Sequence, residues 1–598
     1  MSDPYRVVDE ALGKMNLQQK VGQIFTQSFY GSLITPDVVH MIKDMDCAGL
    51  RVTSFYRQFR HYARPGQERQ AFDRSSPGDI PPDQFSDIKD VLCKPPYLSI
   101  EQYADVLNRL KDIAAERPYN APLHLALDQE GDASFDFVRG GVRYFPSQWG
   151  LARTGDPKHV YECARAVGTQ LAAVGFNVIH SPVLDVVLNP DSTYIGTRGF
   201  GTDPEFVTEM GAAFIRGFRE AGVMCCGKHY PGRGSTNVDD HHDLGEIPRS
   251  DEDMWNVELY PYRRLMPEGL PMIMIGHSIY PCWDKEHPAS CSRTIQMDVT
   301  RGRVGFKGII TTDSMIMLAI AKKYGSIPAG CLMAAKAGAN LILMKETGPI
   351  RDEAYRLVLE AAKSGEIPER ELDERIATTL RWKVDYGLYG ANYRVDAKKA
   401  PKTIRAKSME RIETRAARKA VHVVRDTAGL LPLPRTTRTL VAEQIAGPHL
   451  NANDFWAHPG CFWEALLAKS DQVSQLEIEA DPKPEDRTKL LEYMKYYDVL
   501  IVTHFSGRSS RSTVNLINEV LAARPGESPA AGGGTAPAAA GKKVIVVTNS
   551  PLPYDTPAEW PTVICTYGVM PPELRAAADL IYGDLKPARP KNKQPWDM

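Results

Sequence analysis

The sequence has neither a long apolar stretch nor an excess of charge of one sign. No run approaches the ~18 uninterrupted apolar residues of a membrane-spanning helix, and the N-terminus shows no apolar core of a signal peptide. With 72 basic and 74 acidic side chains the formal net charge is -2, so electrostatics give no case for nucleic acid or an anionic membrane as a partner. These absences favour a cytoplasmic protein.

Disulfide, metal and dinucleotide patterns are also missing. The ten cysteines form no Cys-x-x-Cys repeat, and Cys225 and Cys226 are adjacent inside an apolar run. We expect such residues to be buried thiols rather than a disulfide framework or a zinc site. In the C-terminal part no Gly-x-Gly-x-x-Gly follows a predicted strand, which gives a dinucleotide-binding fold little support.

What the first two thirds of the chain do contain is a repeated alternation of short apolar runs with helix-length segments. Residues 1–20 are predicted to form a helix, and Pro157–Val174 is a typical segment between two runs. Runs that are apolar on both faces are typical of a parallel sheet, and eight of them predict a (β/α)8 TIM barrel over residues 1–392. A doubly wound open sheet is the alternative. The eight predicted strands are Gln23–Phe29, Gly49–Phe55, Leu123–Leu127, Phe176–Val187, Gly222–Cys226, Pro271–Ile275, Gly308–Thr312 and Asn340–Met344.

A chain of 598 residues exceeds one ordinary domain of about 100–250 residues, and a second domain is predicted after a basic linker at 393–410. This domain, 411–598, should begin with a helix near Ser408–Val424 and form a smaller α/β sandwich with a mostly parallel sheet. A low-complexity loop is expected at 528–542. The predicted strands are Thr439–Ile445, Val499–Phe505, Lys543–Thr548 and Thr562–Tyr567.

A long insertion at 56–97, rich in proline and arginine, interrupts the barrel after its second predicted strand. It is too long for an ordinary connection, and the carboxyl ends of the barrel strands meet on that side. The insertion is therefore either a lid over the site or a solvated surface loop.

Polar residues follow several of the predicted barrel strands. In a barrel the carboxyl ends of the strands converge, so that residues distant in sequence meet around one substrate. Taken singly, such a residue more often has a structural role than a catalytic one. The residues are Asp128 after the third strand, Arg198 in the loop after the fourth, Lys228 and His229 after the fifth, His277 after the sixth and Asp313 after the seventh.

Two of these positions suit the cleavage of a glycosidic bond. Retaining cleavage needs a carboxylate that attacks the anomeric carbon and a separate acid that protonates the leaving oxygen. Asp313 ends an apolar strand and fits the first role, whereas Asp239 and His241 form a pair in which the carboxylate can orient the imidazole for proton transfer. The alternatives are a turn-capping Asp239, a solvated His241 and an Asp313 that only ends its strand.

The motifs resemble those of the β-N-acetylhexosaminidases of glycoside hydrolase family 3 over most of residues 10–390. Downstream of the barrel, Ala420–Asp426 and, near the C-terminus, Ile581–Asp584 are similar to the second, α/β sandwich domain of that family. The segments of the barrel that carry the resemblance are Asp128–Gly131, Pro182–Asp185, Arg198–Gly201, Lys228–Gly234 with Asp239-x-His241, His277–Pro281, Pro288–Ser292 and Gly305–Asp313.

The resemblance implies a retaining exo-β-glycosidase that hydrolyses terminal β-linked N-acetylglucosamine, or a closely related amino sugar, through a covalent glycosyl-aspartate. It implies no metal and no organic cofactor, and a small carbohydrate or glycoconjugate as the substrate; a homodimer is compatible with it. Residue by residue it implies Asp313 as nucleophile, His241 as acid/base with Asp239 as its orienting partner, and Asp128, Arg198, Lys228 and His229 as ligands of the sugar.

One segment departs from the family pattern. Where the family has a second arginine after Asp128–Gly131, this chain has Asp136. Either Arg139 or an arginine of the insertion binds the sugar in place of the family's second arginine, or the sugar is not plain N-acetylglucosamine. Three alternative functions remain: a β-N-acetylglucosaminide phosphorylase, because a neutral imidazole would not repel phosphate; a β-glucosidase-like glycosidase; and a carbohydrate-binding protein without catalysis.

Overall fold

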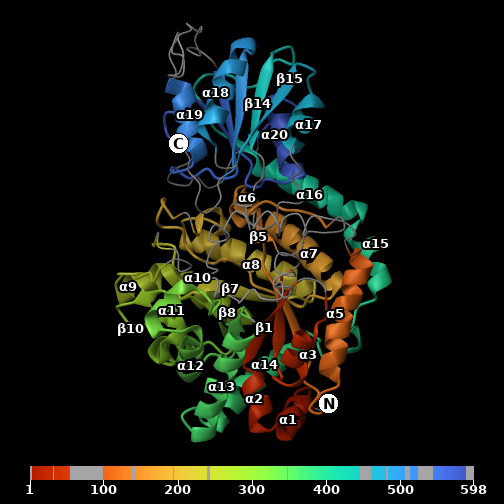
Figure 1. The fold of residues 1–598 in the computed structure, drawn as a ribbon, viewed down its shortest axis with the longest axis vertical. Helices are drawn as coiled ribbons and strands as arrows, with labels where there is room; N and C mark the ends of the chain where they lie inside the picture. The colour runs from red at the N-terminus through yellow and green to blue at the C-terminus, as the bar shows by residue number, and fades with distance from the viewer. Residues whose placement is uncertain are drawn as a thin grey trace, which may run out of the picture.

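The structure is a computed structural model, and Figure 1 shows a larger body that contains the N-terminus below a smaller body built by the last third of the chain. Asp239, His241, Asp136, Arg139 and the whole insertion at 56–97 lie outside the described residues, as does the loop at 528–542. The described residues are 3–30, 33–53, 98–132, 134–135, 142–192, 194–236, 238, 243–346, 348–444, 460–479, 482–505, 512–522 and 543–587.

The larger body is a parallel (β/α)8 barrel, as predicted. Its sheet has the strand order β11-β8-β7-β6-β3-β2-β1-β12, and every pairing within it is parallel. A parallel bridge between Thr311 and Leu341 joins the two end strands, so the sheet closes on itself. The strands are β1 (Phe25–Tyr30), β2 (Gly49–Thr53), β3 (His124–Leu127), β6 (Val178–Ile179), β7 (Met224–Tyr230), β8 (Met272–Ile275), β11 (Ile309–Thr312) and β12 (Ile342–Met344).

Two predicted strand boundaries are wrong. The fourth strand, β6, spans only two residues, because the chain then reaches Pro182, which has no backbone N–H to donate. Strand β7 continues to Tyr230, so Lys228 and His229 belong to the strand instead of following it. Main-chain hydrogen bonds maintain it: the Lys228 N–H donates to Pro182 O at 2.9 Å, and Lys228 O accepts from the Leu184 N–H at 2.6 Å.

The predicted single helix over residues 1–20 is two helices, α1 (Arg6–Lys14) and α2 (Leu17–Gly22). Asn16 starts the second helix, because its side chain accepts from the Gln19 N–H at 2.9 Å and the Gln19 side chain accepts from the Asn16 N–H at 3.1 Å. The other predicted helix of the barrel, Pro157–Val174, is found with those bounds as α7.

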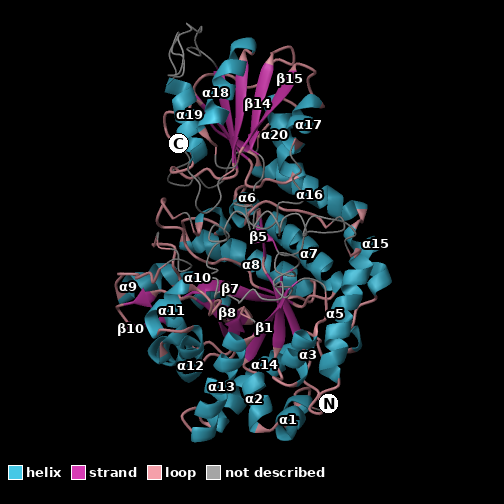
Figure 2. Cartoon of the chain, viewed as in Figure 1, coloured by secondary structure: helices cyan, strands magenta, loops and turns pink. Residues whose placement is uncertain are grey.

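Helices surround the barrel sheet on its outside (Figure 2). Several begin with proline directly after a capping Asp or Thr, which favours a helix start at that point. The main ones besides α7 are α3 (Pro36–Lys43), α5 (Ile100–Ala115), α8 (Pro204–Glu220), α10 (Tyr260–Leu265), α12 (Ile327–Ala337), α13 (Pro349–Ser364) and α14 (Glu369–Asp385). Shorter elements at the rim include β4 (Gln129–Gly131), β5 (Ser134–Phe135), α6 (Gln148–Ala152) and the 3-10 turn η3 (Gly196–Arg198). None of the helices in the described ranges is long and apolar enough to cross a membrane.

The smaller body is an α/β domain with a six-stranded sheet of order β13-β18-β17-β16-β14-β15. All pairings are parallel except that of β13 with β18, which agrees with the predicted mostly parallel sheet. Its strands are β13 (His422–Asp426), β14 (Thr439–Gln444), β15 (Val473–Ile478), β16 (Val499–His504), β17 (Lys543–Thr548) and β18 (Thr562–Cys565), and its helices are α16 (Lys407–Ala420), α17 (Cys461–Leu467), α18 (Pro484–Tyr493), α19 (Ser512–Ala522) and α20 (Pro571–Ile581).

The two edge strands were not predicted. Strand β15 is half exposed and therefore has no continuous apolar run. The predicted helix Ser408–Val424 ends at Ala420, and the following residues form β13, because the β-branched pair Val423–Val424 favours a strand. The predicted linker at 393–410 runs along the barrel, where Tyr393 Oη donates to Leu123 O at 2.6 Å and Lys111 Nζ donates to Tyr393 O at 2.7 Å. The domain limits 1–392 and 411–598 stay predictions.

The smaller domain lies over the rim of the barrel near α6 (Figure 1). Asn549, which follows β17, donates to Asp132 Oδ2 of the barrel at 3.1 Å, and the Ser147 N–H of the barrel donates to Tyr567 O at 2.8 Å. The carboxyl ends of β17 and β18 thus face the loop that follows β3 of the barrel.

Replacing Glu573 by glutamine is expected to stabilise the protein at neutral and alkaline pH. Glu573 is fully buried in the first turn of α20, and burial, with repulsion from Glu413 and Asp132, raises the pKa of its carboxyl well above the ordinary value. The folded state therefore keeps a proton that the unfolded state releases above a pKa of about 4.3, and stability falls as the pH rises through and beyond that value until the folded-state pKa is passed.

We expect the melting temperature of Glu573→Gln to exceed that of the wild type by about 2–4 °C at pH 8, with a difference that disappears toward pH 4.5. Thermal unfolding at several pH values measures this. The control is Glu268→Gln at an exposed position, which should leave the pH profile unchanged. If the melting temperature of Glu573→Gln exceeds that of the wild type by the same amount at every pH, the effect does not come from the titration of Glu573.

Candidate active site

The structure brings together five residues predicted from their positions near strand ends: Asp128, Arg198, Lys228, His229 and Asp313. Lys228 Nζ lies 3.0 Å from Asp128 Oδ1, and Arg198 Nη2 lies 3.4 Å from His229 Nε2. His229 Nε2 is 3.9 Å from Asp313 Oδ2. These residues come from four different strand ends or loops, so the contacts define a single site at the carboxyl end of the barrel.

A chain of alternating charges lines one side of this site. Lys228 Nζ contacts both Asp128 and Glu130 Oε1, the latter at 2.5 Å, and Arg198 binds Glu130 through two hydrogen bonds of 2.7 and 3.0 Å. Burial alone would raise the pKa values of Asp128 and Glu130, but the surrounding cations hold both well below their ordinary values. The two carboxylates in turn keep the pKa of buried Lys228 above its ordinary value. All these groups are therefore charged at neutral pH and fixed in position.

Arg51 is a member of this site that the sequence did not reveal. It lies in β2, is 3% exposed, forms an ion pair with Asp128 Oδ2 and donates to Val52 O at 2.9 Å. An arginine inside an apolar strand is the signal that could have found it, because a buried charge needs a partner. Arg51 thus supplies a cation to Asp128, the residue whose neighbouring segment departs from the family pattern at Asp136.

His229 is oriented by Asp185, a fully buried carboxylate in the loop after β6. Asp185 Oδ2 accepts from the His229 main-chain N–H at 3.0 Å and from the ring Nδ1 at 2.7 Å. Because an ionised carboxylate only accepts, the ring proton is on Nδ1, and Nε2 faces Asp313. Burial lowers the pKa of His229, whereas the neighbouring Asp185 and Asp313 carboxylates act to raise it. The sequence motif contained Asp185, but no role was predicted for it.

Asp313 follows β11 and has a side chain that is 8% exposed. Its Oδ1 accepts from the Ser314 N–H at 2.6 Å. Burial would raise the pKa of this carboxyl, but His229, His277, Lys345 and the Ser314 N–H together hold it well below its ordinary value. An ionised, fixed carboxylate is suited to act as a nucleophile and unsuited to act as an acid.

His277, the rim residue after β8, has a supporting place in this arrangement. Its Nε2 donates to Ser314 O at 3.0 Å, and its Nδ1 accepts from the Ser290 hydroxyl at 2.8 Å. The ring is completely buried. His277 therefore holds the main chain next to Asp313.

The chain that leads to Asp239 and His241 is anchored at several points. Asp185 Oδ1 accepts from the Arg233 N–H at 2.8 Å, and Arg233 Nη2 donates to Val238 O at 2.7 Å. Gly234 O accepts from the main-chain N–H groups of Leu188 and Asn189, both at 3.0 Å. The described part of this segment is thus fixed up to the residue before Asp239.

Replacing Gly234 by alanine should lower kcat about 100-fold, because a misplacement of roughly 1 Å can have that effect in an active site. A Cβ at this position would lie 1.6 Å from Val186 O, so the main chain would have to move. Steady-state kinetics on an aryl glycoside measure the loss. Gly302→Ala is the control, since its Cβ would meet only Met297 O at 3.4 Å. Wild-type kcat in Gly234→Ala would show that this segment does not position catalytic groups.

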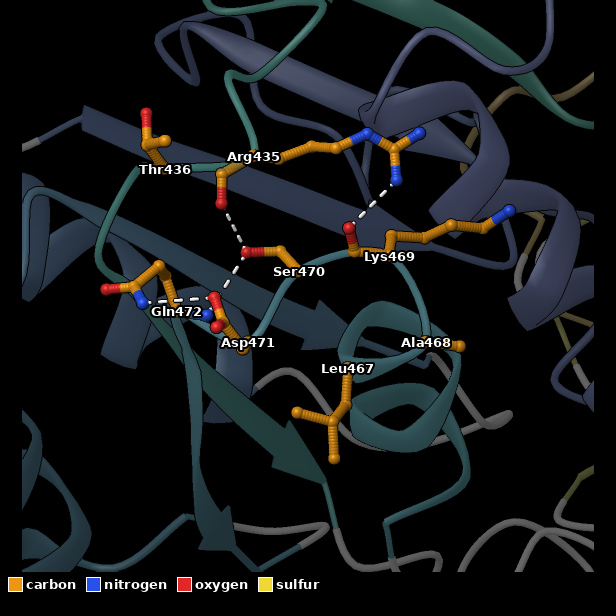
Figure 3. Close-up of a pocket in the computed structure, with 8 residues that line it drawn as sticks. All are labelled: Arg435, Thr436, Leu467, Ala468, Lys469, Ser470, Asp471 and Gln472. Atoms are coloured by element: carbon orange, nitrogen blue, oxygen red, sulfur yellow. Dashed lines mark hydrogen bonds between the residues drawn. The ribbon is translucent and has the colours of Figure 1, made fainter.

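A pocket of about 560 Å³ lies elsewhere, on the smaller domain (Figure 3). Its two cations, Arg435 and Lys469, are paired with Asp584 at 2.8 and 3.0 Å, and Ser470 donates to Arg435 O at 2.5 Å. None of the strand-end carboxylates of the barrel lines it. This pocket is therefore separate from the candidate site in the barrel.

Comparisons with known proteins agree with this fold. The family model described as the glycosyl hydrolase family 3 N terminal domain matches residues 92–381. A β-hexosaminidase of Nitrosomonas eutropha is 35% identical over 237 residues, which are 39% of this chain and 67% of that protein. A β-hexosaminidase of Tolumonas auensis is 36% identical over 278 residues, which are 44% of this chain and 80% of that protein.

Two solved structures share the two-domain fold. A glycoside hydrolase family 3 β-N-acetylglucosaminidase of Paenibacillus sp. superposes with a TM-score of 0.77 and 24% identity over 96% of this chain and 98% of that chain. A β-glucoside phosphorylase superposes with a TM-score of 0.75 and 19% identity over 98% and 96% of the two chains. The chain thus belongs to glycosyl hydrolase family 3, in its β-hexosaminidase branch, and is an enzyme of the glycoside hydrolase type.

Proposed function

We propose that the protein hydrolyses terminal β-linked N-acetylglucosamine, or a closely related amino sugar, with retention of configuration. The observation that carries this proposal is the ionised Asp313 carboxylate, fixed beside His229 and adjacent to the charged groups Asp128, Lys228 and Arg198. Its similarity to β-hexosaminidases supports the choice of sugar.

In the proposed mechanism the Asp313 carboxylate attacks the anomeric carbon, while His241, oriented by Asp239, protonates the leaving oxygen. A covalent glycosyl-Asp313 results. His241 then takes a proton from water, the water attacks the same carbon, and the sugar leaves with its configuration retained. The protein needs no metal or organic cofactor for these steps.

The sugar would be held by groups that are in place before it binds. Asp128 would accept from the hydroxyls of the sugar, and Lys228, Arg198 and His229 would donate to them. Each group is already held by ion pairs or hydrogen bonds, so little ordering is needed when the ring binds.

A screen of p-nitrophenyl β-glycosides, with and without inorganic phosphate, tests the proposal. We expect release of p-nitrophenol from the N-acetyl-β-glucosaminide, with free sugar as the product at every phosphate concentration. Formation of sugar 1-phosphate with faster turnover would instead establish a phosphorylase. Preference for the plain β-glucoside would overturn the choice of sugar, and no release from any glycoside would overturn catalysis itself.

We place this activity in the cytoplasm. The nine cysteines in the described part of the chain are all free thiols, and eight of them are buried. Free thiols without a disulfide framework are usual in a reducing compartment.

A further inference from the structure

Tyr194 lies where three parts of the proposed site meet. Its ring centroid is 4.9 Å from Cζ of Arg198 and 4.4 Å from Cζ of Arg233, both within the range of a cation–π contact. The rings of Tyr194 and His229 are 5.8 Å apart. Tyr194 O also accepts from Arg198 Nη1 at 3.1 Å. The residue thus contacts a proposed sugar ligand through both its ring and its main chain.

On its other side Tyr194 belongs to an apolar cluster that joins the two domains. The side chain is 3% exposed. The barrel contributes Trp149, Val183, Val187, Tyr194 and Ile195 to the cluster, and the smaller domain contributes Ala420, Leu552, Cys565 and Tyr567. A residue that touches Arg198 is therefore part of the apolar cluster that both domains build.

The turn that carries Arg198 is itself in contact with the smaller domain. Gly196, two residues before Arg198, has φ +45°, and a Cβ there would lie 3.3 Å from Tyr554 Oη and 3.6 Å from Leu552 Cδ1. The segment after β17 therefore rests against η3. The position of the segment after β17 and the position of Arg198 are therefore linked through Tyr194 and Gly196.

We propose that Tyr194 is a positioning residue that transmits the docking of the smaller domain to the Arg198 guanidinium. The two hydrogen bonds to Glu130 hold the Arg198 guanidinium in place, and the aromatic ring of Tyr194 restricts the orientation of the guanidinium plane. The smaller domain thereby takes part in sugar binding through Tyr194. This inference rests on the proposed role of Arg198 as a sugar ligand.

A double-mutant cycle in the full-length protein tests this link. Tyr194→Leu fills the apolar cluster but removes the ring, and we expect kcat/KM on p-nitrophenyl N-acetyl-β-glucosaminide to fall about tenfold, with Tyr194→Phe losing about threefold at most. In an Arg198→Lys background, which keeps the cation beside Glu130, the effect of Tyr194→Leu should shrink to about twofold. Equal losses in both backgrounds would overturn the proposal.

Leu552→Ala provides a second test from the smaller domain, because Leu552 belongs to the cluster that contains Tyr194 and lies beside Gly196. We expect KM to rise about threefold, and this rise to vanish in the Arg198→Lys background. Tyr582→Leu, in the separate core of the smaller domain, is the matched control and should lower the melting temperature with unchanged kcat/KM. If Leu552→Ala behaves like this control, the smaller domain does not act on Arg198.

Failure of the proposed function would be visible separately. If the wild-type enzyme cleaves another aryl glycoside and not the N-acetyl-β-glucosaminide, N-acetylglucosamine is refuted as the sugar. The double-mutant cycle of Tyr194 and Arg198 would then be measured on the glycoside that is cleaved. Additive effects on that substrate would still overturn the role of Tyr194.

Discussion

Replacing Asp313 by alanine is expected to lower kcat by at least about 10⁴-fold, since loss of a nucleophile removes a covalent step that other groups cannot replace. The fold should remain intact, because the Asp313 side chain accepts a hydrogen bond only from the adjacent Ser314 N–H among the bonds described for it. Steady-state kinetics and a melting curve measure the two effects.

Rescue by an external nucleophile separates a nucleophile from a merely structural carboxylate. Azide is small and anionic, and in Asp313→Ala it can enter the space that the carboxylate leaves. We expect azide to restore turnover of an activated aryl glycoside and to give a glycosyl azide of inverted configuration. Asp313→Asn, which fills the space, is the control and should not be rescued. Substantial hydrolysis by Asp313→Ala without azide would refute the assignment of the nucleophile.

The barrel could be predicted from the sequence because its strands are buried on both faces and read as apolar runs. The same reasoning explains where prediction failed. Lys228 and His229 are polar, so the sequence ended β7 before them, whereas main-chain bonds to Pro182 and Leu184 continue the strand. Strand β15 at the edge of the smaller sheet is half exposed and has no apolar run to find.

The same contrast holds within the site. Asp128, Arg198 and Asp313 could be found because parallel strands bring their carboxyl ends together. The roles of Asp185 and Arg51 depend on partners 44 and 77 residues away, His229 and Asp128, and only the closed barrel fixes those pairs. The contact of Tyr194 with the smaller domain depends on docking of the two domains, which no local pattern encodes.

Replacing His241 by alanine is expected to affect substrates according to their leaving group. When the leaving group is a second sugar, it departs as an alkoxide, which is a strong base and needs a proton. Turnover of such a disaccharide should therefore fall about 10³-fold, within the range that general acid catalysis contributes. A dinitrophenolate leaves without protonation, and the first step on its glycoside should change less than about tenfold. Burst kinetics with a dinitrophenyl N-acetyl-β-glucosaminide, compared with hydrolysis of a disaccharide, measure the two cases.

Asp239→Asn is the matched variant for this experiment, since it keeps the imidazole and weakens only its partner. We expect the same dependence on the leaving group with a smaller amplitude, because a misoriented imidazole still donates a proton in part of the molecules. The second step should slow in both variants, as the imidazole also has to take a proton from water; a glycosyl-enzyme would then accumulate on the activated substrate. Equal losses on the disaccharide and the activated glycoside would argue against His241 as the acid and would transfer that role to another group at the rim of the barrel.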